Sequence, residues 1–321
     1  MTQLSVCMVL RDEESVLQRC IDSLGQIFDE LCVVDTGSID RTIDIAKENG
    51  ARVERFTECN NAQGQITDFA MARNRALELA TGDWVLQIDG DEVLQTGAPR
   101  VVKHIHDPSI DQVGVLMSSE GAEWVSTRLF RRSDSLRYES RVHEYLVHSG
   151  NFVVDRNISI VNFPNKIGKE KSSDRNIRLC LSMLADDPKN SRILHYLGNE
   201  YRKLRRFSEA IDAYAAALQF DQYRVGKYHT SYYLAVCELL EGNWEAAIDA
   251  AMGCLKIDPR YAEAPCLLGD VYSSSGDLAF AVEWYQSALS KTPPVDAVMA
   301  VQHWAYREHP RARLEKILAY V

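Results

Sequence analysis

Apolar positions in the first third of the chain follow two alternating patterns. Short continuous apolar runs bounded by turn residues predict buried strands. These predicted strands are residues 4–10, 30–34, 52–56, 84–88 and 113–117. Between them, apolar residues recur at helical spacing and predict helices over residues 14–24, 40–49 and 69–80. Strands that alternate with helices indicate an α/β domain with a mainly parallel sheet.

The pattern changes near residue 172, where the strand signals stop and paired helical patterns repeat. Three segments align with one another, with starts near Ser191, Tyr228 and Ala262, and the spacing of the last two equals the 34-residue tetratricopeptide period. The third copy carries nearly the full repeat pattern, at Leu268, Gly269, Tyr272, Gly276, Ala281, Tyr285, Ala288 and Pro293. Small residues at such positions let paired helices approach while aromatic side chains fill the space between them.

We therefore expect two domains, an α/β domain over residues 1–170 and an all-α tetratricopeptide-repeat domain over residues 171–321. A basic connector, NKIGKEKSSDR, separates them. Residues 173–188 resemble the second helix of a half repeat, and residues 295–321 are expected to cap the array. The repeats alone show no obvious chemistry, so they are interpreted as a scaffold for a partner or for self-association, with direct capture of substrate as the alternative.

Composition and charge argue against several classes of binding partner. The formal net charge is −10, which argues against broad binding to nucleic acid or to an anionic membrane surface. No apolar run is long enough for a membrane span, and acidic residues come too early for a signal peptide, so a cytoplasmic protein is expected. The eight cysteines are scattered, with no CxxC pair, and are expected to be reduced thiols in the core.

Carboxylates follow two of the predicted strands. Asp35 comes directly after residues 30–34, and Asp89, Asp91 and Glu92 follow residues 84–88. Ligands of parallel α/β sheets bind at the carboxyl ends of the strands, and two carboxylates on either side of a glycine can hold a hard cation. By itself, DGDE also fits a solvated acidic turn, or the Asp-x-Asp-x-Val-Leu nucleophile motif of haloacid-dehalogenase-type phosphatases. That phosphatase motif follows the first strand of its domain, whereas here it follows the fourth.

Three ordered strings carry a resemblance to a known family: LSVCMVLRDEESVLQRCIDSL, DELCVVDTGSIDRTIDIAKENGARV and DFAMARNRALELATGDWVLQIDGDEVL. They resemble the family-2 glycosyltransferases of GT-A fold, and most closely the branch in which tetratricopeptide repeats follow the transferase domain. The resemblance covers nearly the whole chain. It implies a Rossmann-like GT-A domain followed by an all-α repeat domain.

The resemblance also implies roles for individual residues. The nucleotide-sugar donor would contact Leu10, Arg11, Glu13, Asp35, Asp68, Arg73 and Asp89. Asp89 and Asp91 would hold a divalent cation, Mn²⁺ or Mg²⁺, and Glu92 would support their loop. For Arg73, a contact with phosphate or ribose and a salt bridge on the helix surface both remain open. Asn74 belongs to the same matched string.

Downstream, RLFRRSDSLRYESRVHEYL resembles a segment that ends in a His-Glu pair, here His143 and Glu144. His143 would be a third metal ligand and Glu144 a general base, although the pattern leaves open which of the two is the base. Further residues expected to line the acceptor or diphosphate side are Trp124, Arg128, Arg131 and Arg132. The chain departs from the usual family residues at Asp12, Ile39 and Gly90, and none of these changes removes a metal ligand.

The expected activity is an inverting, metal-dependent transfer of a sugar from a nucleotide-sugar, first of all a UDP-sugar, by a hexosyltransferase-type enzyme. The acceptor would be a peptide, a protein or a glycan, and the repeats could also join copies of the chain. Two alternatives stay open: a non-catalytic repeat scaffold with a degenerate transferase domain, and the phosphatase.

Overall fold

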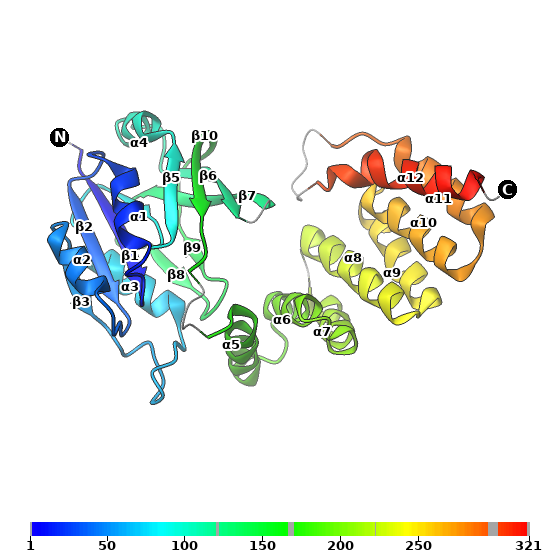
Figure 1. Ribbon diagram of the computed structural model, residues 1–321, viewed down its shortest axis with the longest axis horizontal. Helices are drawn as coiled ribbons and strands as arrows, with labels where there is room; N and C mark the ends of the chain where they lie inside the picture. Colours follow the sequence, from blue (N-terminus) through cyan, green and yellow to red (C-terminus); the bar gives the residue numbers. More distant parts are fainter. Residues whose placement is uncertain (1, 120–121, 166–169, 222, 295–300, 320–321) are drawn as a thin grey trace. The chain divides into compact units, whose positions relative to one another are not determined.

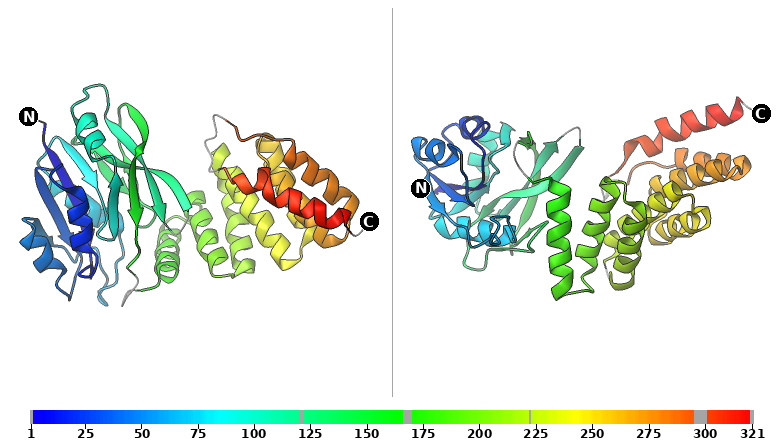
Figure 2. Two further views of the ribbon diagram at one scale, coloured as in Figure 1. Left: turned by 45° about the horizontal axis from the view of Figure 1, so that its top comes forward. Right: turned by 60° about the horizontal axis from the view of Figure 1, so that its bottom comes forward.

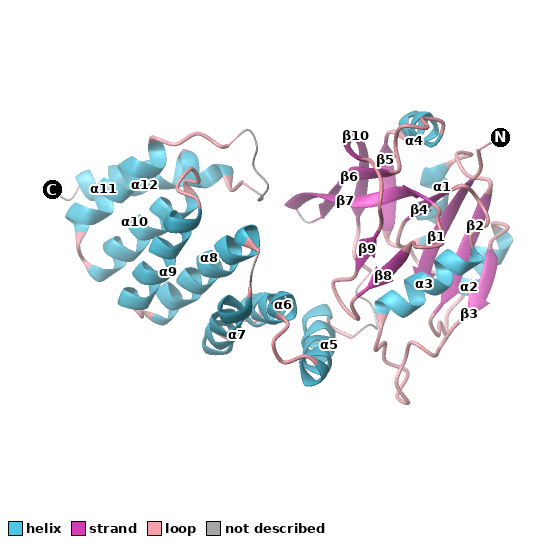
Figure 3. Ribbon diagram, turned by 180° about the vertical axis from the view of Figure 1, so that it is seen from behind, coloured by secondary structure: helices cyan, strands magenta, loops and turns pink. Residues whose placement is uncertain are grey.

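A computed structural model describes residues 2–119, 122–165, 170–221, 223–294 and 301–319 (Figure 1). The chain divides into two compact units, residues 1–170 and residues 171–321. The first combines helices with a sheet and the second is built from helices (Figure 3). The predicted fold class, a mainly parallel α/β domain followed by an all-α repeat domain, is confirmed.

The described residues of the first unit contain an eight-stranded sheet with the order β3-β2-β1-β4-β7-β6-β10-β5. Its strands are β1 (Leu4–Leu10), β2 (Glu30–Asp35), β3 (Arg52–Arg55), β4 (Trp84–Gln87), β5 (Glu92–Thr96), β6 (Gln112–Ser119), β7 (Ala122–Arg131) and β10 (Phe152–Asn162). The first four strands run parallel to one another. β7 and β5 run antiparallel to their neighbours. A separate hairpin pairs β8 (Arg137–Glu139) with β9 (Tyr145–Val147).

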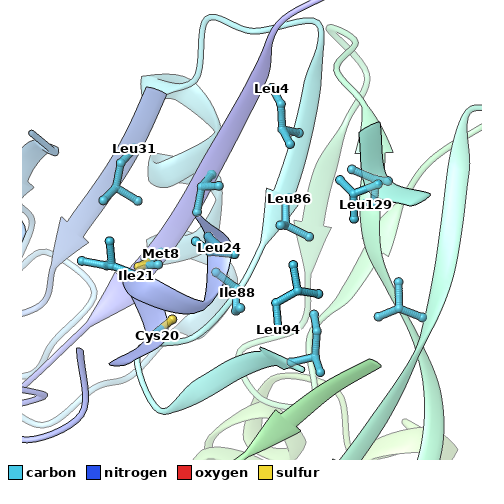
Figure 4. Close-up of a cluster of buried hydrophobic side chains, with 14 of the residues drawn as sticks. Leu4, Met8, Cys20, Ile21, Leu24, Leu31, Leu86, Ile88, Leu94 and Leu129 are labelled. Carbon is cyan, nitrogen blue, oxygen red and sulfur yellow. The ribbon is translucent and has the colours of Figure 1, made fainter. Parts of the chain in front are cut away.

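Helices cover the sheet on both faces. One core cluster joins β1 and β4 to α1 (Leu17–Leu24), α2 (Thr42–Glu48) and α4 (Ala98–Ile105). In Figure 4, Leu24 of α1 lies among Met8 of β1, Leu86 of β4 and Ile88, which directly follows β4. A second cluster joins the opposite face of β1 and β4 to α3 (Phe69–Leu79). All eight cysteines lie in the described residues and are buried and free of disulfides, as predicted.

The second unit is a succession of helix pairs (Figure 2). Its helices are α5 (Ser172–Asp186), α6 (Ser191–Lys203), α7 (Phe207–Phe220), α8 (Arg224–Glu241), α9 (Trp244–Ile257), α10 (Glu263–Ser275), α11 (Leu278–Leu289) and α12 (Glu308–Leu318), with a short 3-10 helix η1 (His303–Tyr306) before the last. The expected cap is partly described: residues 295–300 and 320–321 lie outside the described residues. None of the described helices has the length and apolar character needed to cross a bilayer.

The repeat glycines allow close packing of the helix pairs. A Cβ atom on Gly269 of α10 would lie 2.4 Å from Cδ1 of the Tyr285 ring in α11. We expect Gly269→Ala to destabilise the helical unit by about 1 to 3 kcal/mol, because overfilling a packed site forces side chains and backbone to shift. The matched control is Gly253→Ala in α9, where the nearest atom to an added Cβ is Ser231 Oγ at 4.0 Å.

The control should be neutral or stabilising by up to about 1 kcal/mol, since alanine is the better helix former. The midpoints of thermal unfolding of the two variants provide the comparison. Equal midpoints would contradict the packing role assigned to Gly269.

Candidate functional site

Loops from three parallel strands meet at one edge of the sheet. Leu10 at the end of β1 pairs in register with Asp35 at the end of β2. On the other side of β1, Gly90 after β4 packs so closely that an added Cβ would lie 2.7 Å from Leu10 Cδ2 and 3.1 Å from Glu13 Cγ. The parallel topology therefore brings three predicted positions, Leu10, Glu13 and Asp35, together with Asp89 and Asp91, to the carboxyl ends of neighbouring strands, where α/β proteins bind ligands.

Asp89 is the centre of a cluster of five charged side chains. Arg73 of α3 donates from Nη1 and Nη2 to the two carboxylate oxygens of Asp89, at 2.9 and 3.2 Å. Its Nε donates to Glu144 Oε1 at 2.6 Å. Arg128 of β7 donates to Glu92 Oε1 at 2.6 Å, and its Nη1 lies 3.8 Å from Asp89 Oδ2. The backbone N–H of Asp89 donates to Glu92 Oε2 at 2.8 Å. Residues from α3, β5, β7 and the hairpin loop are thus joined in one network.

Burial and charge act in opposite directions on the carboxyl groups of this cluster. Burial would raise the pKa of Asp89, but the Arg73 and Arg128 guanidinium groups outweigh it and lower the pKa to about 2. For Glu92, burial dominates over the attraction of Arg128 and raises the pKa to about 7. Asp89 is therefore ionised at neutral pH, whereas Glu92 titrates near it. Such separation of neighbouring carboxyl groups is characteristic of reactive sites.

Asp91 belongs to a second set of contacts, with the segment after β10. Its Oδ1 accepts from the Asn162 amide at 3.0 Å, and its Oδ2 accepts from the backbone N–H of Asn165 at 3.4 Å. The Asn165 amide also donates to Glu13 Oε2 at 3.1 Å and to the carbonyl of Asp12 at 3.0 Å. Asn165 thereby links the loops after β1 and β4. The two asparagines were not predicted.

The expected ligands of the metal are only partly brought together. Among the residues that the structure describes, the donor atoms of Asp89, Asp91 and His143 do not form a set that lies within 4.8 Å of one another. His143 lies in the loop between β8 and β9 beside Glu144, with a φ of +51°, in the left-handed region that non-glycine residues seldom adopt. The set that meets this distance is Cys266, Asp270 and His309, in the helical unit.

Two more residues that were predicted to contact the nucleotide-sugar, Asp35 and Arg11, form hydrogen bonds with nearby backbone groups. The fully buried carboxylate of Asp35 accepts from the backbone N–H groups of Gly37 and Ser38, and the Arg55 Nε lies 3.8 Å away. The guanidinium of Arg11 donates to the carbonyl of Gly64.

Asp68 and Asn74 hold α3 in place. Asp68 is the N-cap of this helix and accepts from the backbone N–H of Met71 at 2.9 Å. The Asn74 amide exchanges hydrogen bonds with the backbone of Tyr138 in β8, at 2.7 and 3.0 Å. These contacts fix the helix that carries Arg73 against the hairpin that carries Glu144.

Of the basic residues expected near the acceptor, only Arg128 joins the site. Arg131 lies over the Trp84 ring, 4.8 Å from its centroid, and Arg132 donates to the carbonyl of Gly82 at 2.8 Å. Both contacts are at the beginning of β4, at the opposite end of the strand from Asp89, so these two side chains do not join the Asp89 cluster. Trp124 on β7 is a half-exposed side chain.

Comparison with known proteins finds matches in both units of the chain. The family described as "Glycosyl transferase family 2" matches residues 5–175, and tetratricopeptide repeats match residues 191–223 and 267–296. A TPR repeat-containing protein of Synechococcus elongatus is 29% identical over an alignment of 316 residues, which covers 91% of this chain and 76% of that protein. The SPbeta prophage-derived glycosyltransferase SunS of Bacillus subtilis is 26% identical over an alignment of 219 residues, which covers 64% of this chain and 50% of SunS. A glycosyltransferase of Rickettsia typhi, described as uncharacterized, is 31% identical over 105 residues, 33% of each chain.

Proposed function

The chain belongs to glycosyl transferase family 2, and from this premise we propose that it transfers a sugar from a nucleotide-sugar to an acceptor with inversion at the anomeric carbon. The observation that carries the proposal is the cluster of Asp89, Arg73 and Glu144 at the carboxyl ends of the parallel strands. It joins two carboxylates through one guanidinium group in a mostly buried site, at the sheet edge where ligands of α/β proteins bind. A UDP-sugar is the proposed donor.

A divalent cation, Mn²⁺ or Mg²⁺, is proposed as cofactor. Asp89 and Asp91 offer carboxylate oxygens, the donors that these hard cations prefer, so the residues present fit such an ion. When bound, the ion would offset the negative charge that develops on the departing diphosphate. We assign the ion to these two carboxylates, because His143 does not form a close set with them in this structure.

Arg73 and Glu144 are proposed to act on the acceptor side. The Nε–H of Arg73 holds Oε1 of Glu144, while Oε2 accepts no hydrogen bond from any residue that the structure describes. That second oxygen is available to take the proton from an acceptor hydroxyl as its oxygen attacks the anomeric carbon. Arg73 is the positioning residue, since it fixes Glu144 and Asp89 through one rigid guanidinium group.

The acceptor is proposed to be a peptide, a protein or a glycan, recruited by the repeats, which could also join copies of this chain. The chain spans about three quarters of the first relative and half of SunS. The substrates and partners of the full-length relatives therefore do not identify those of this chain.

The decisive test is a panel of sugar nucleotides read by thermal shift, with and without Mn²⁺. We expect one UDP-sugar to raise the unfolding midpoint more with Mn²⁺ than without, since a ligand at 100 times its Kd stabilises the folded state by about 2.7 kcal/mol. In Asp91→Asn the part of the shift that depends on Mn²⁺ should disappear.

The control variant is Asp134→Asn, which removes the same charge from an exposed position of the first unit and should keep the full shift. If no member of the panel shifts the midpoint under either condition, the transferase proposal is wrong and the non-catalytic scaffold replaces it.

A further inference from the structure

The helical unit contains a hollow that the transfer reaction does not use. Its volume is about 330 Å³, and it lies among residues of α6, α8 and the beginning of α10. Four tyrosines line it, Tyr228, Tyr232, Tyr233 and Tyr261, together with the carboxylate of Glu263. The volume is within the range of small-ligand sites.

The four tyrosine rings around the hollow form two contacting pairs. The ring centroids of Tyr228 and Tyr261 are 5.3 Å apart, and those of Tyr232 and Tyr233 are 5.4 Å apart. The face of an aromatic ring carries negative electrostatic potential and attracts a cation placed within about 6 Å. The protein already uses this attraction at the hollow, because the guanidinium of Arg202 lies 4.2 Å from the Tyr233 centroid.

Glu263 adds a formal negative charge. Glu263 is only 3% exposed. Its carboxylate accepts from the backbone N–H of Gln302 at 2.7 Å and from the Tyr306 hydroxyl at 3.2 Å. It forms no ion pair with any residue in the described ranges. Both donors are neutral groups, and burial raises the pKa of this carboxyl group, against smaller opposing effects of these hydrogen bonds and of His303.

The hydroxyl group of Tyr228 is a second, independent observation at this hollow. The residue is 3% exposed, and its hydroxyl is buried without a hydrogen bond to any group that the structure describes. Buried hydroxyl groups in native proteins are nearly always hydrogen-bonded, so each exception needs an explanation. A ligand with hydrogen-bond donors would give this hydroxyl a partner.

We propose that the hollow binds the basic side chain of a polypeptide, a lysine or an arginine, with the cationic head between the tyrosine rings and Glu263. Such a head donates several hydrogen bonds, which suit the Glu263 carboxylate and the Tyr228 hydroxyl, and its alkyl stem suits the rings. Arg202 does not take this position, because it stacks on Tyr233 and donates to the Tyr214 hydroxyl at 3.3 Å. The site does not depend on the transferase activity.

The full chain can be tested with fluorescent peptides of glycine and serine, capped at both ends, that carry one central lysine, arginine or norleucine. Binding is measured by anisotropy at about 0.3 M salt, where attraction to the acidic surface is largely screened. We expect saturable binding of the lysine or the arginine peptide, and at least about tenfold weaker binding of norleucine, which has the stem without the charge.

Two variants and one control locate the site. Glu263→Gln should weaken binding at least about tenfold, whereas Glu241→Gln, the same change at the exposed end of α8, should leave it unchanged. Tyr228→Phe removes only the unpartnered hydroxyl, so it should keep or raise the unfolding midpoint and still weaken binding severalfold. It serves as the readout if Glu263→Gln does not fold.

Several results would overturn the proposal. These are no saturable binding of either basic peptide up to a few millimolar, equal binding of norleucine, or unchanged binding in both Glu263→Gln and Tyr228→Phe. n-Butylammonium tests for a free amine in place of a polypeptide. If it binds as tightly as the lysine peptide, the assignment to a polypeptide partner is wrong.

Discussion

Replacing Arg73 with methionine is expected to lower the free energy of unfolding of the first unit by about 3 to 5 kcal/mol, the usual cost of leaving buried charge unpaired. Its side chain is 12% exposed and compensates two carboxylates at once, Asp89 and Glu144. Without it, two negative charges remain close together in a mostly buried site, next to Glu92. Methionine keeps most of the side-chain volume, so the loss reports on charge more than on packing.

The matched control for this change is Arg75→Met, two residues further along α3. Arg75 also contacts two carboxylates, Glu54 and Glu78, but its side chain is 38% exposed, and Glu78 is more exposed still. Water screens such surface pairs, so the control should show only a small part of the Arg73 effect. Urea unfolding of both variants gives the comparison.

A triple variant separates charge from packing at Arg73. Adding Asp89→Asn and Glu144→Gln to Arg73→Met removes the unpaired charges and should recover much of the lost stability. Equal losses for the two methionine variants, or no recovery in the combined variant, would show that Arg73 contributes mainly through packing.

The strands that the sequence predicts most directly are those buried on both faces. β1 and β4 contact helices on both faces, so every residue is buried or nearly so and the strands appear as continuous apolar runs. β10 was missed because its pairing with β6 shifts register between Asp155 and Ser159, which breaks the alternation that identifies a strand. β5 was missed because it begins with a charged residue, Glu92, which had been interpreted as part of a loop.

The site residues that could be predicted are those at the carboxyl ends of predicted parallel strands. Leu10, Asp35, Asp89 and Asp91 each come at or just after the end of a predicted parallel strand, and the topology alone brings such ends together. Their partners were not predictable. Asn162 and Asn165 contact Asp91 from about seventy residues away, and no local spacing encodes such contacts.

Arg73 shows what the local pattern could not decide. Either a contact with phosphate or ribose, or a salt bridge on the helix surface, fitted the helical spacing of its segment. The structure instead gives a buried ion pair with residues from two other elements. The guanidinium and a cation would both use the oxygens of Asp89. Binding of the proposed cation is therefore expected to change the Arg73 contacts, and under the proposed reaction Arg73 would link the donor and acceptor sides.

Glu144→Gln is expected to lower turnover by about 10² to 10⁴, the usual contribution of a general base, with donor affinity unchanged within a factor of about two. This expectation depends on the proposed transfer reaction. The amide keeps the size of the side chain and can still accept from Arg73, but it cannot take a proton. Hydrolysis of the UDP-sugar provides the measurement, because water then stands in for the acceptor and must lose a proton to the same group.

The control for Glu144 is Glu139→Gln in the same hairpin. Glu139 contacts Arg137 and the Tyr145 hydroxyl at an exposed position, so its loss should leave the rate of UDP release unchanged. His143→Gln completes the set, because the sequence left open which residue of the pair is the base. If His143→Gln loses turnover by the amount expected for Glu144 while Glu144→Gln stays within tenfold of the unmodified protein, the imidazole is the base. The ion pair with Arg73 would then only hold the loop in place.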